Sequence, residues 1–177
     1  MKTEKISAKV GETFRVAGIE FIRFPETAEG VPVVAKAIQK EMAFGENNDL
    51  RNSKVLAWIR EEFLPKIVAA IGEENLVQFK TDLTTLDGLD NYGTMESKIS
   101  LPTMDFYRAN VEVFDKYPVK RWWWLATPDS CQPHCDPDWI LCVAPSGYIN
   151  FSVFSYDYGG VRPFLILKSS IFESLES

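Results

Sequence analysis

Two stretches in the last third of the chain decide the fold. Residues 121–128 read Arg121-Trp122-Trp123-Trp124-Leu125-Ala126-Thr127-Pro128, and residues 160–167 read Gly160-Val161-Arg162-Pro163-Phe164-Leu165-Ile166-Leu167. Both runs are apolar and aromatic and lie next to turn-forming residues, which is typical of β-strands. Side chains alternate between the two faces of a strand, so Trp122 and Trp124 should point one way and Trp123 the other.

The segments around these runs predict further strands. Residues 139–143 and 148–154 are separated by a turn at Pro145-Ser146-Gly147. Near the start of the chain, Phe14, Val16, Ile19 and Phe21 alternate with polar residues on both sides of Ala17-Gly18, which is the pattern of a β-hairpin. We expect this opening hairpin to pair with residues 164–167 and so to bring the termini together.

The clearest helical pattern covers residues 50–71. Asn52 or Ser53 can cap its first turn, and Gly72 can end it. Pro65 lies within the pattern and should kink or split the helix, because proline lacks the N–H donor.

Shorter elements complete the prediction. Thr103 can cap a helical turn that runs to about Asn110, and residues 31–44 fit a strand continuing into a short helix. Residues 75–100 predict irregular strands and loops, and residues 111–118 a connection. We therefore expect an α+β fold of antiparallel strands with one or two flanking helices. It forms a single domain over residues 1–177, with a core at about 10–168 and a frayed tail at 169–177.

Composition excludes several classes of protein. The 177 residues carry 19 Lys and Arg against 25 Asp and Glu, a net charge of −6, which argues against binding to nucleic acid or to a membrane surface. No apolar run approaches the ~18 residues of a membrane span, and no apolar segment of a secretory signal follows the charged start. The chain has three cysteines, Cys131, Cys135 and Cys142. An odd number of cysteines without a secretory signal favours reduced thiols in the cytoplasm of the producing cell.

The order of motifs resembles that of DUF6273, a bacterial and phage family. The chain carries Asn47-Asn48-Asp49 at the start of the long helix, then Ile99-Ser100-Leu101-Pro102, then Trp123-Trp124-Leu125-Ala126-Thr127-Pro128 and finally Gly160-Val161-Arg162-Pro163. The resemblance covers about residues 10–168. It implies a C-type-lectin-like fold with paired terminal strands and with ligand-contacting loops on one side. Ala126 stands where the family's strand usually has an arginine.

The resemblance also implies a binding surface in the last third of the chain. In the diversified phage and retroelement proteins of the C-type lectin group, the variable surface lies there and favours Tyr, Ser and Asn, which combine amphipathic contact area with adaptable hydrogen bonds. The candidate ligand-binding residues are Trp122, Trp124, Asp129, Gln132, His134, Asp136, Asp138, Tyr148, Asn150, Tyr156 and Tyr158. Four others are expected to be structural, namely Trp123, Gly147, Gly160 and a buried, hydrogen-bonded Arg162.

The segment 127–138 contains residue types that hold metals. Asp129, Asp136 and Asp138 could bind calcium, although their spacing is not that of an EF-hand. Cys131, His134 and Cys135 could bind zinc, but the usual second ligand pair is missing unless Cys142 completes the set. The expectation is therefore no metal and no cofactor.

No catalytic arrangement stands out. His134 is the only histidine, and no Ser/His/Asp or Cys/His pattern and no glycine-rich phosphate loop is visible, so we do not expect an enzyme. The favoured interpretation is a non-catalytic module that binds a protein or a glycan, as a phage receptor-binding or accessory protein would, in which case it would be associated with the virion.

Two alternatives stay open. One is an intracellular phage or mobile-element protein that binds and inhibits a host protein, its acidic surface meeting a basic one. The other is a metal-dependent oxidase of the sulfatase-modifying type. Cys131 and Cys135 invite that comparison, but no other residue of that site has a visible match. The sequence gives no oligomeric state.

Overall fold

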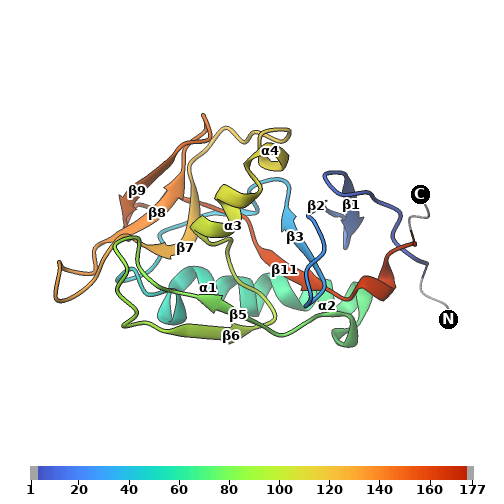
Figure 1. Cartoon of the computed structure of the whole chain (residues 1–177), viewed down its shortest axis with the longest axis horizontal. Helices are drawn as coiled ribbons and strands as arrows, with labels where there is room; N and C mark the ends of the chain where they lie inside the picture. Colours follow the sequence, from blue (N-terminus) through green and yellow to red (C-terminus); the bar gives the residue numbers. More distant parts are fainter. Residues whose placement is uncertain (1–3, 175–177) are drawn as a thin grey trace.

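The computed structural model describes residues 4–174 and shows an α+β fold with mostly antiparallel sheets (Figure 1). The first sheet contains β1 (Thr13–Val16), β2 (Ile19–Arg23), β3 (Val31–Ala35) and β11 (Phe164–Leu167), in the order β1-β2-β3-β11. The β1–β2 hairpin is confirmed. Ala17 and Gly18 connect it with φ angles of 53° and 75°, the left-handed conformation that a tight hairpin turn needs.

The expected pairing of this hairpin with the last strand is wrong in detail. β1 and β11 belong to one sheet, but β3 lies between the hairpin and β11 and pairs with both neighbours in antiparallel fashion. Every residue of β3 is buried, so the strand can occupy the centre of the sheet. The apolar run at residues 31–35 carries this signal, but the sequence gives no pairing partner for it.

The second sheet holds the tryptophan strand. Its order is β4-β10-β7-β8-β9, and only the contact between β10 and β7 is parallel. These strands are β4 (Lys40–Glu41), β7 (Trp123–Pro128), β8 (Trp139–Val143), β9 (Ile149–Val153) and β10 (Gly160–Val161). The predicted short helix after β3 is wrong. Residues 40–41 form a short strand instead, because this segment pairs with β10.

Both faces of β7 are buried. Trp124 packs into one hydrophobic cluster and Trp123 into another, so the alternation predicted for the tryptophan run is confirmed. Each cluster also contains residues from the first sheet, such as Leu165 in one and Ile166 in the other. The two large sheets therefore share their hydrophobic core.

The long helix is continuous over 18 residues. It comprises α1 (Lys54–Trp58), the π-helical turn η2 (Ile59–Phe63) and α2 (Leu64–Ile71), and it begins where the Ser53 hydroxyl accepts the N–H of Leu56 at 2.9 Å. Pro65 neither ends nor splits it. The wider π turn comes directly before Pro65, at the point where the missing N–H would otherwise interrupt the hydrogen-bond ladder. None of the helices in residues 4–174 is long and apolar enough to cross a membrane.

The remaining elements are short. The strands β5 (Phe79–Asp82) and β6 (Thr94–Ser97) form a separate hairpin. Thr103 caps α3 (Met104–Ala109) as expected, whereas α4 (Val111–Phe114) lies in the stretch that we expected to be a plain connection. Three 3-10 turns complete the part of the chain that the structure describes, at η1 (Leu50–Asn52), η3 (Glu73–Asn75) and η4 (Ser169–Ile171).

The described part of the expected tail is packed. Ile6 forms a parallel bridge with Phe172, with hydrogen bonds from Ile6 N to Ile171 O at 2.8 Å and from Glu173 N to Ile6 O at 2.9 Å. Phe172 is only 3% exposed and contacts the ring of Phe14. Residues 169–174 are therefore anchored rather than frayed, and residues 175–177 lie outside the described part.

Candidate functional site

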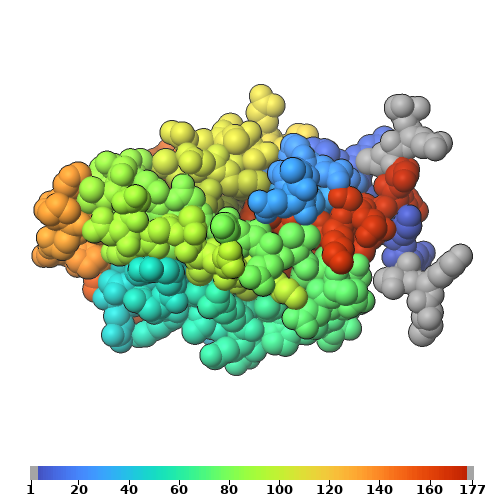
Figure 2. All heavy atoms as spheres, turned by 60° about the horizontal axis from the view of Figure 1, so that its bottom comes forward, coloured from blue at the N-terminus to red at the C-terminus, as the bar shows by residue number. Residues whose placement is uncertain are grey.

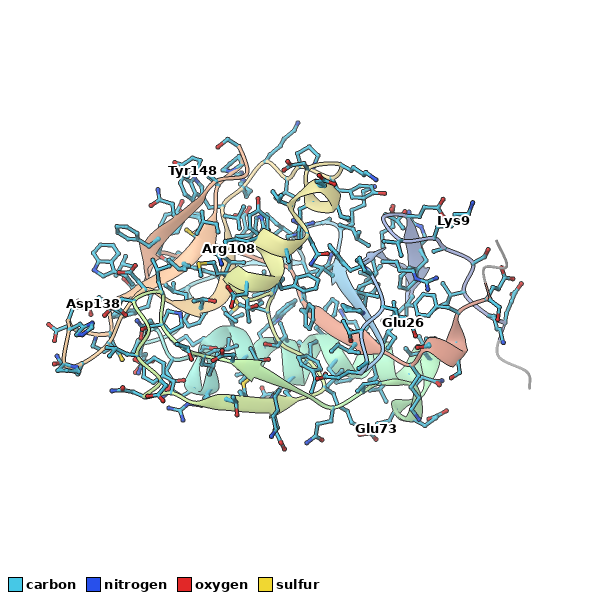
Figure 3. All side chains as sticks on the ribbon, viewed as in Figure 1. Lys9, Glu26, Glu73, Arg108, Asp138 and Tyr148 are labelled. Atoms are coloured by element: carbon cyan, nitrogen blue, oxygen red, sulfur yellow. The ribbon has the colours of Figure 1, made fainter. Side chains whose placement is uncertain are left out.

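The loop between β7 and β8 forms one end of the molecule. In Figure 2 this segment, in orange, lies beside the green segment that follows β5. Asp138 and Tyr148 lie toward this end, away from Lys9 and Glu26 (Figure 3). The candidate residues at 129–138 and 148–158 therefore gather on one side of the molecule, and two polar clusters beneath them hold the loop.

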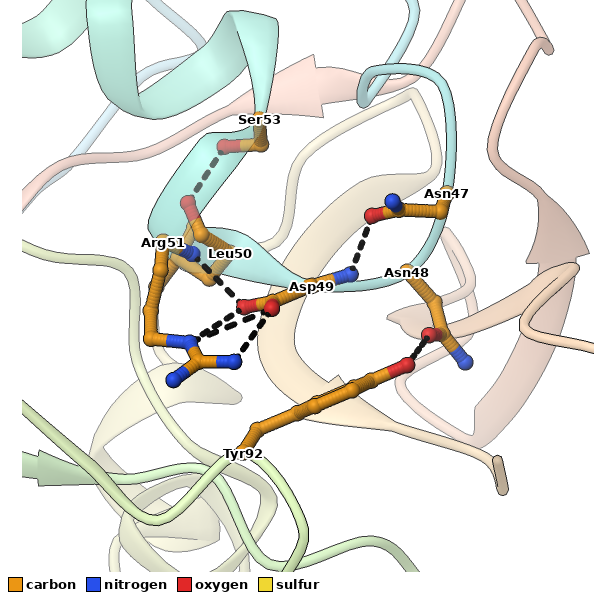
Figure 4. Close-up of polar contacts among 7 residues, drawn as sticks. All are labelled: Asn47, Asn48, Asp49, Leu50, Arg51, Ser53 and Tyr92. Atoms are coloured by element: carbon orange, nitrogen blue, oxygen red, sulfur yellow. Dashed lines mark hydrogen bonds and ion pairs between the residues drawn. The ribbon is translucent and has the colours of Figure 1, made fainter. Parts of the chain in front are cut away.

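The first cluster is centred on Asn48, which is fully buried (Figure 4). Its side-chain amide donates to the carbonyl oxygens of Ser130 at 2.7 Å and Trp139 at 2.9 Å, one on each side of the loop. Its amide oxygen accepts the hydroxyl of Tyr92 at 2.7 Å. One asparagine thus fixes both ends of the loop. In the sequence, Asn48 stood out only as part of the Asn47-Asn48-Asp49 motif of the resemblance, and no role was predicted for it.

The base of this cluster is a buried carboxylate. Asp49 is 5% exposed and forms a two-pronged ion pair with Arg51, with Oδ2 at 2.7 Å from Nη2. Its backbone N–H donates to the side-chain oxygen of Asn47 at 2.9 Å. The hydrogen bond to Asp49 raises the pKa of Arg51 above its usual value. These contacts of Asp49 with Arg51 and Asn47 therefore fix the backbone of the segment that carries Asn48.

The second cluster is centred on Asp87. Its carboxylate accepts the hydroxyls of Ser130 and Thr85, each at 2.5 Å, and lies 2.7 Å from Nδ1 of His134. Ser, Asp and His meet here with the acid in the middle, so the serine is bonded to the carboxylate and not to the imidazole. The arrangement therefore lacks the serine–base contact that activates a nucleophile.

The Asp87 cluster predicts a pH-dependent contribution to stability. Hydrogen bonds hold the pKa of Asp87 well below its usual value of 3.8. The bond from Ser130 has the largest effect, followed by those from Thr85 and His134. A carboxyl whose pKa is lowered by folding stabilises the fold above its unfolded pKa and loses this effect as the pH falls below it. We expect Asp87→Asn to lower the melting temperature at neutral pH, and the difference from the wild type to shrink below about pH 3.8.

Asp90→Asn is the matched control, since Asp90 is an exposed acid of the same loop whose side chain forms no hydrogen bond with a residue of the described range. A difference between wild type and Asp87→Asn that stays constant down to pH 2, or an equal effect in Asp90→Asn, would contradict the assignment.

The thiols and acids of the loop do not converge in the described structure. No three His, Cys, Asp or Glu side chains in residues 4–174 converge on a point where an ion could sit. Cys131 and Cys142 are buried, and burial raises the pKa of both thiols, that of Cys142 to about 12. Cys135 is exposed, and all three cysteines are unpaired.

The other loop candidates are tied to one another. His134 contacts Asp87, and Gln132 donates to Asp136 at 2.9 Å. Asp129 is half-buried, which raises its pKa, and its N–H bonds to the carbonyl of Trp139; Asp138 is likewise half-buried. The geometry therefore does not support the calcium and zinc hypotheses that the spacing left open.

A group of aromatic side chains lies on β8, β9 and the adjoining segments, and we call it the aromatic surface. It consists of Trp122, Trp139, Tyr148, Phe151, Tyr156 and Tyr158. Their rings touch in pairs edge to face, Trp122 with Tyr148, Trp139 with Phe151 and Tyr156 with Tyr158, with centroids 5.4 to 5.8 Å apart. Exposure ranges from 40% for Trp139 and Tyr156 to 63% for Tyr158, while Trp122 is half-buried.

Trp139 and Phe151 were missed as candidates. Trp139 begins β8, and Phe151 lies in the middle of the edge strand β9. Phe151 is 49% exposed on the edge strand of the sheet, and Trp139 is 40% exposed at the first position of β8.

Trp124 is a wrong candidate. It is 1% exposed, its indole N–H donates to the carbonyl of Met42 at 3.0 Å, and its ring packs on Phe44. Asn150 remains partly accessible, although its side-chain oxygen already accepts the N–H of Phe151.

Two hollows lie on the aromatic surface. One, of about 190 Å³, is lined by Trp122, Phe151, Ser152 and Tyr156, among others. The second, of about 430 Å³, lies between Lys120, Arg121, Tyr156 and Tyr158, and Trp122 also lines it. The hollows thus share Trp122 and Tyr156, and the second has basic residues at its edge.

The residues expected to be structural are all positioned by backbone constraints or burial. Gly147 has φ 93° in the turn after β8, and a Cβ on Gly160 would lie 2.6 Å from Ile38. Trp123 is buried, and Arg162 is 1% exposed and donates to the backbone carbonyls of Ala35 and Lys36.

Comparison with known proteins adds no identity: no protein-family model, no curated protein and no solved structure matches this chain. The resemblance to DUF6273 therefore stays a prediction.

Proposed function

We propose that this protein is a non-catalytic binding module that recognises a protein partner through the aromatic surface. The observation that carries the proposal is a set of five exposed aromatic side chains, and a sixth that is half-buried, around the edge of one sheet. The strand register places Trp139 and Phe151 on one face of this sheet and Trp122 on the other, so the aromatic side chains flank the edge on both sides. Tyr and Trp provide large contact areas with few rotatable bonds and dominate the energetics of protein interfaces. The arginine and lysine at the larger hollow add groups that can pair with an acidic side chain of the partner.

The edge strand β9 favours a polypeptide over a glycan as the partner. Within the described residues β9 pairs only with β8, and its sequence Ile149-Asn150-Phe151-Ser152-Val153 contains no charge and no proline. Charges, prolines and bulges are the usual means of blocking an open edge. An extended segment of a partner can add to such an edge through backbone hydrogen bonds, with its side chains against the neighbouring aromatic rings.

A C-type-lectin-like fold of the DUF6273 type is part of this proposal. It is supported by the position of β1 and β11 in one sheet and by the bridge between Ile6 and Phe172. The strands β8 and β9, which carry much of the aromatic surface, lie at the other end of the molecule, as ligand-contacting loops do in that fold (Figure 1). A phage receptor-binding or accessory protein is the role that we propose for such a module.

Site-specific photocrosslinking tests the proposal. A photoreactive phenylalanine analogue replaces Phe151 in one variant and the exposed Val10, next to Lys9 at the opposite end, in the control. We expect a discrete adduct with a protein only from position 151. Adducts of equal yield from both positions would contradict the proposal, as would binding to a glycan array that needs Tyr158 while no protein adduct forms.

Substitutions then measure the contribution of the surface. Against the crosslinked partner, Phe151→Ala and Tyr158→Ala should each weaken binding about 30-fold, the effect of losing about 2 kcal/mol at an interface hot spot. Both side chains are about half exposed or more, so the melting temperature should not change. Val10→Ala is the matched control and should bind as the wild type does. Unchanged affinity in both aromatic variants would place the interface elsewhere.

A further inference from the structure

A third cavity, separate from the two hollows of the aromatic surface, is lined in part by the turn that follows β8. Its volume is about 270 Å³, and its lining includes Tyr107, Asp115, Trp123, Ser146 and Arg162. It shares Pro145 with the larger hollow of the aromatic surface but none of the six aromatic residues that define that surface. The proposed function makes no use of this cavity.

Arg162 brings an uncompensated positive charge to the cavity. The side chain is 1% exposed, and no carboxylate of residues 4–174 lies within 4.0 Å of it. Nε and Nη2 donate to the carbonyls of Ala35 at 3.0 Å and Lys36 at 2.9 Å, whereas Nη1 has no hydrogen-bond partner in the described range. The guanidinium lies over the ring of Trp123, 4.7 Å from its centroid.

The charge of Arg162 persists at neutral pH. Burial lowers its pKa to about 10, which still leaves the guanidinium protonated. A buried ion costs several kcal/mol when no counterion offsets its desolvation. Two carbonyls and a tryptophan ring offset part of this cost, and an anion in the cavity would offset more.

Asp115 brings the opposite charge to the same cavity. It follows α4 directly, is exposed, and forms no ion pair or side-chain hydrogen bond with any residue from 4 to 174. Its Oδ1 and the hydroxyl of Tyr107 both lie 3.4 Å from the point where a Cβ on Gly147 would stand. The Tyr107 hydroxyl donates to the carbonyl of Gly147 at 2.5 Å, so its oxygen can still accept a hydrogen bond.

The two charges line one cavity without pairing with each other. Arg162 lies at its buried wall, and Asp115 with the Tyr107 oxygen offers acceptors on the exposed side. Tyr107 and Trp123 add aromatic side chains to the lining of the cavity. A ligand that satisfies both charges carries an anionic and a cationic group, and the volume of about 270 Å³ limits it to a small molecule.

We propose that this cavity binds a small molecule that carries a carboxylate and an ammonium group, the charge pattern of a free amino acid. The carboxylate pairs with Nη1 of Arg162, and the ammonium group pairs with Asp115 and the Tyr107 oxygen. The side chain of the ligand lies against the aromatic side chains of the lining.

Titration of the whole protein with single amino acids, followed by nuclear magnetic resonance, tests this site. We expect at least one amino acid to shift the Arg162 Nε–H and Trp123 indole signals in a saturable manner. Acetate, which has only the carboxylate, and ethylamine, which has only the ammonium group, should each bind at least about tenfold more weakly, since each loses one of the two charged contacts.

Asp115→Asn is the decisive variant, because Asp115 is exposed and the fold should tolerate the change. It should weaken amino-acid binding about tenfold or more. The control is Glu112→Gln, since Glu112 is an exposed acid of α4 that does not line the cavity, and this variant should bind as the wild type does.

Three results would overturn the proposal. They are the absence of any saturable shift at Arg162 with all amino acids, equal affinity for acetate and the amino acid, and equal binding by Asp115→Asn and Glu112→Gln. None of them bears on the aromatic surface, whose crosslinking experiment uses a different face and a different kind of ligand.

Discussion

Asn48→Ala should lower the free energy of unfolding by about 3 kcal/mol, because it leaves the two carbonyls of Ser130 and Trp139 and the hydroxyl of Tyr92 without their partner. Each buried polar group left unsatisfied costs about 1–3 kcal/mol, and water that enters the vacated space recovers part of this cost. Urea denaturation measures the change. The loop at 129–138 should also become accessible to protease, since both of its ends are released.

Asn47→Ala is the matched control for this prediction. Asn47 precedes Asn48, is half-buried, and accepts only the N–H of Asp49 at 2.9 Å in the described structure. Its loss should cost about 1 kcal/mol and leave the loop protected. Equal effects of the two alanine substitutions would show that Asn48 is not the group that fixes the loop.

Gly159→Ala should destabilise the fold by about 3 kcal/mol, through overpacking against Trp124. A Cβ at this position would lie 2.0 Å from Cε2 of Trp124, which is fully enclosed. Neither the backbone of Gly159 nor the side chain of Trp124 can move easily, because hydrogen bonds through Met42 hold both of them. The Gly159 carbonyl accepts the N–H of Met42, and the Met42 carbonyl accepts the indole N–H of Trp124, both at 3.0 Å.

A second substitution separates this clash from a general effect on the backbone. Trp124→Phe removes the atoms that the new methyl group would strike, so the double variant should be more stable than the sum of the single effects predicts, by at least about 1 kcal/mol. Gly88→Ala is the control, since Gly88 has φ 93° but nothing within 4 Å of its Cβ position, and it should cost about 1 kcal/mol. Strict additivity of the Gly159 and Trp124 variants would exclude the contact as the cause.

Local patterns in the sequence predicted the local structure well. The alternation around Ala17-Gly18, the cap at Ser53 and the run of three tryptophans each depend on neighbours within a few residues. Pairing over long distances could not be predicted in this way. The insertion of β3 between the hairpin and β11 depends on which buried strands meet, and hydrophobic pattern alone leaves that choice open.

The site was predictable only where exposure follows from residue type. Tyr148, Tyr156 and Tyr158 are exposed as expected. Nothing in the sequence distinguishes a buried tryptophan from an exposed one, and Trp124 is buried on its face of β7. Asn48 contacts residues 82 and 91 positions later in the chain, and Asp87 contacts His134 47 positions later. Polar contacts over such separations leave no periodicity from which they could be read.

The bridge between Ile6 and Phe172 has a practical consequence for attaching the protein to a support. The first and last described segments of the chain, which this bridge joins, lie at the end of the molecule far from β9 (Figure 1). A biotin or a fluorescent label placed near either Ile6 or Phe172 would therefore tether the protein with its aromatic rings facing outward into solution. Biosensor chips and display particles loaded from that end would present every copy in one orientation.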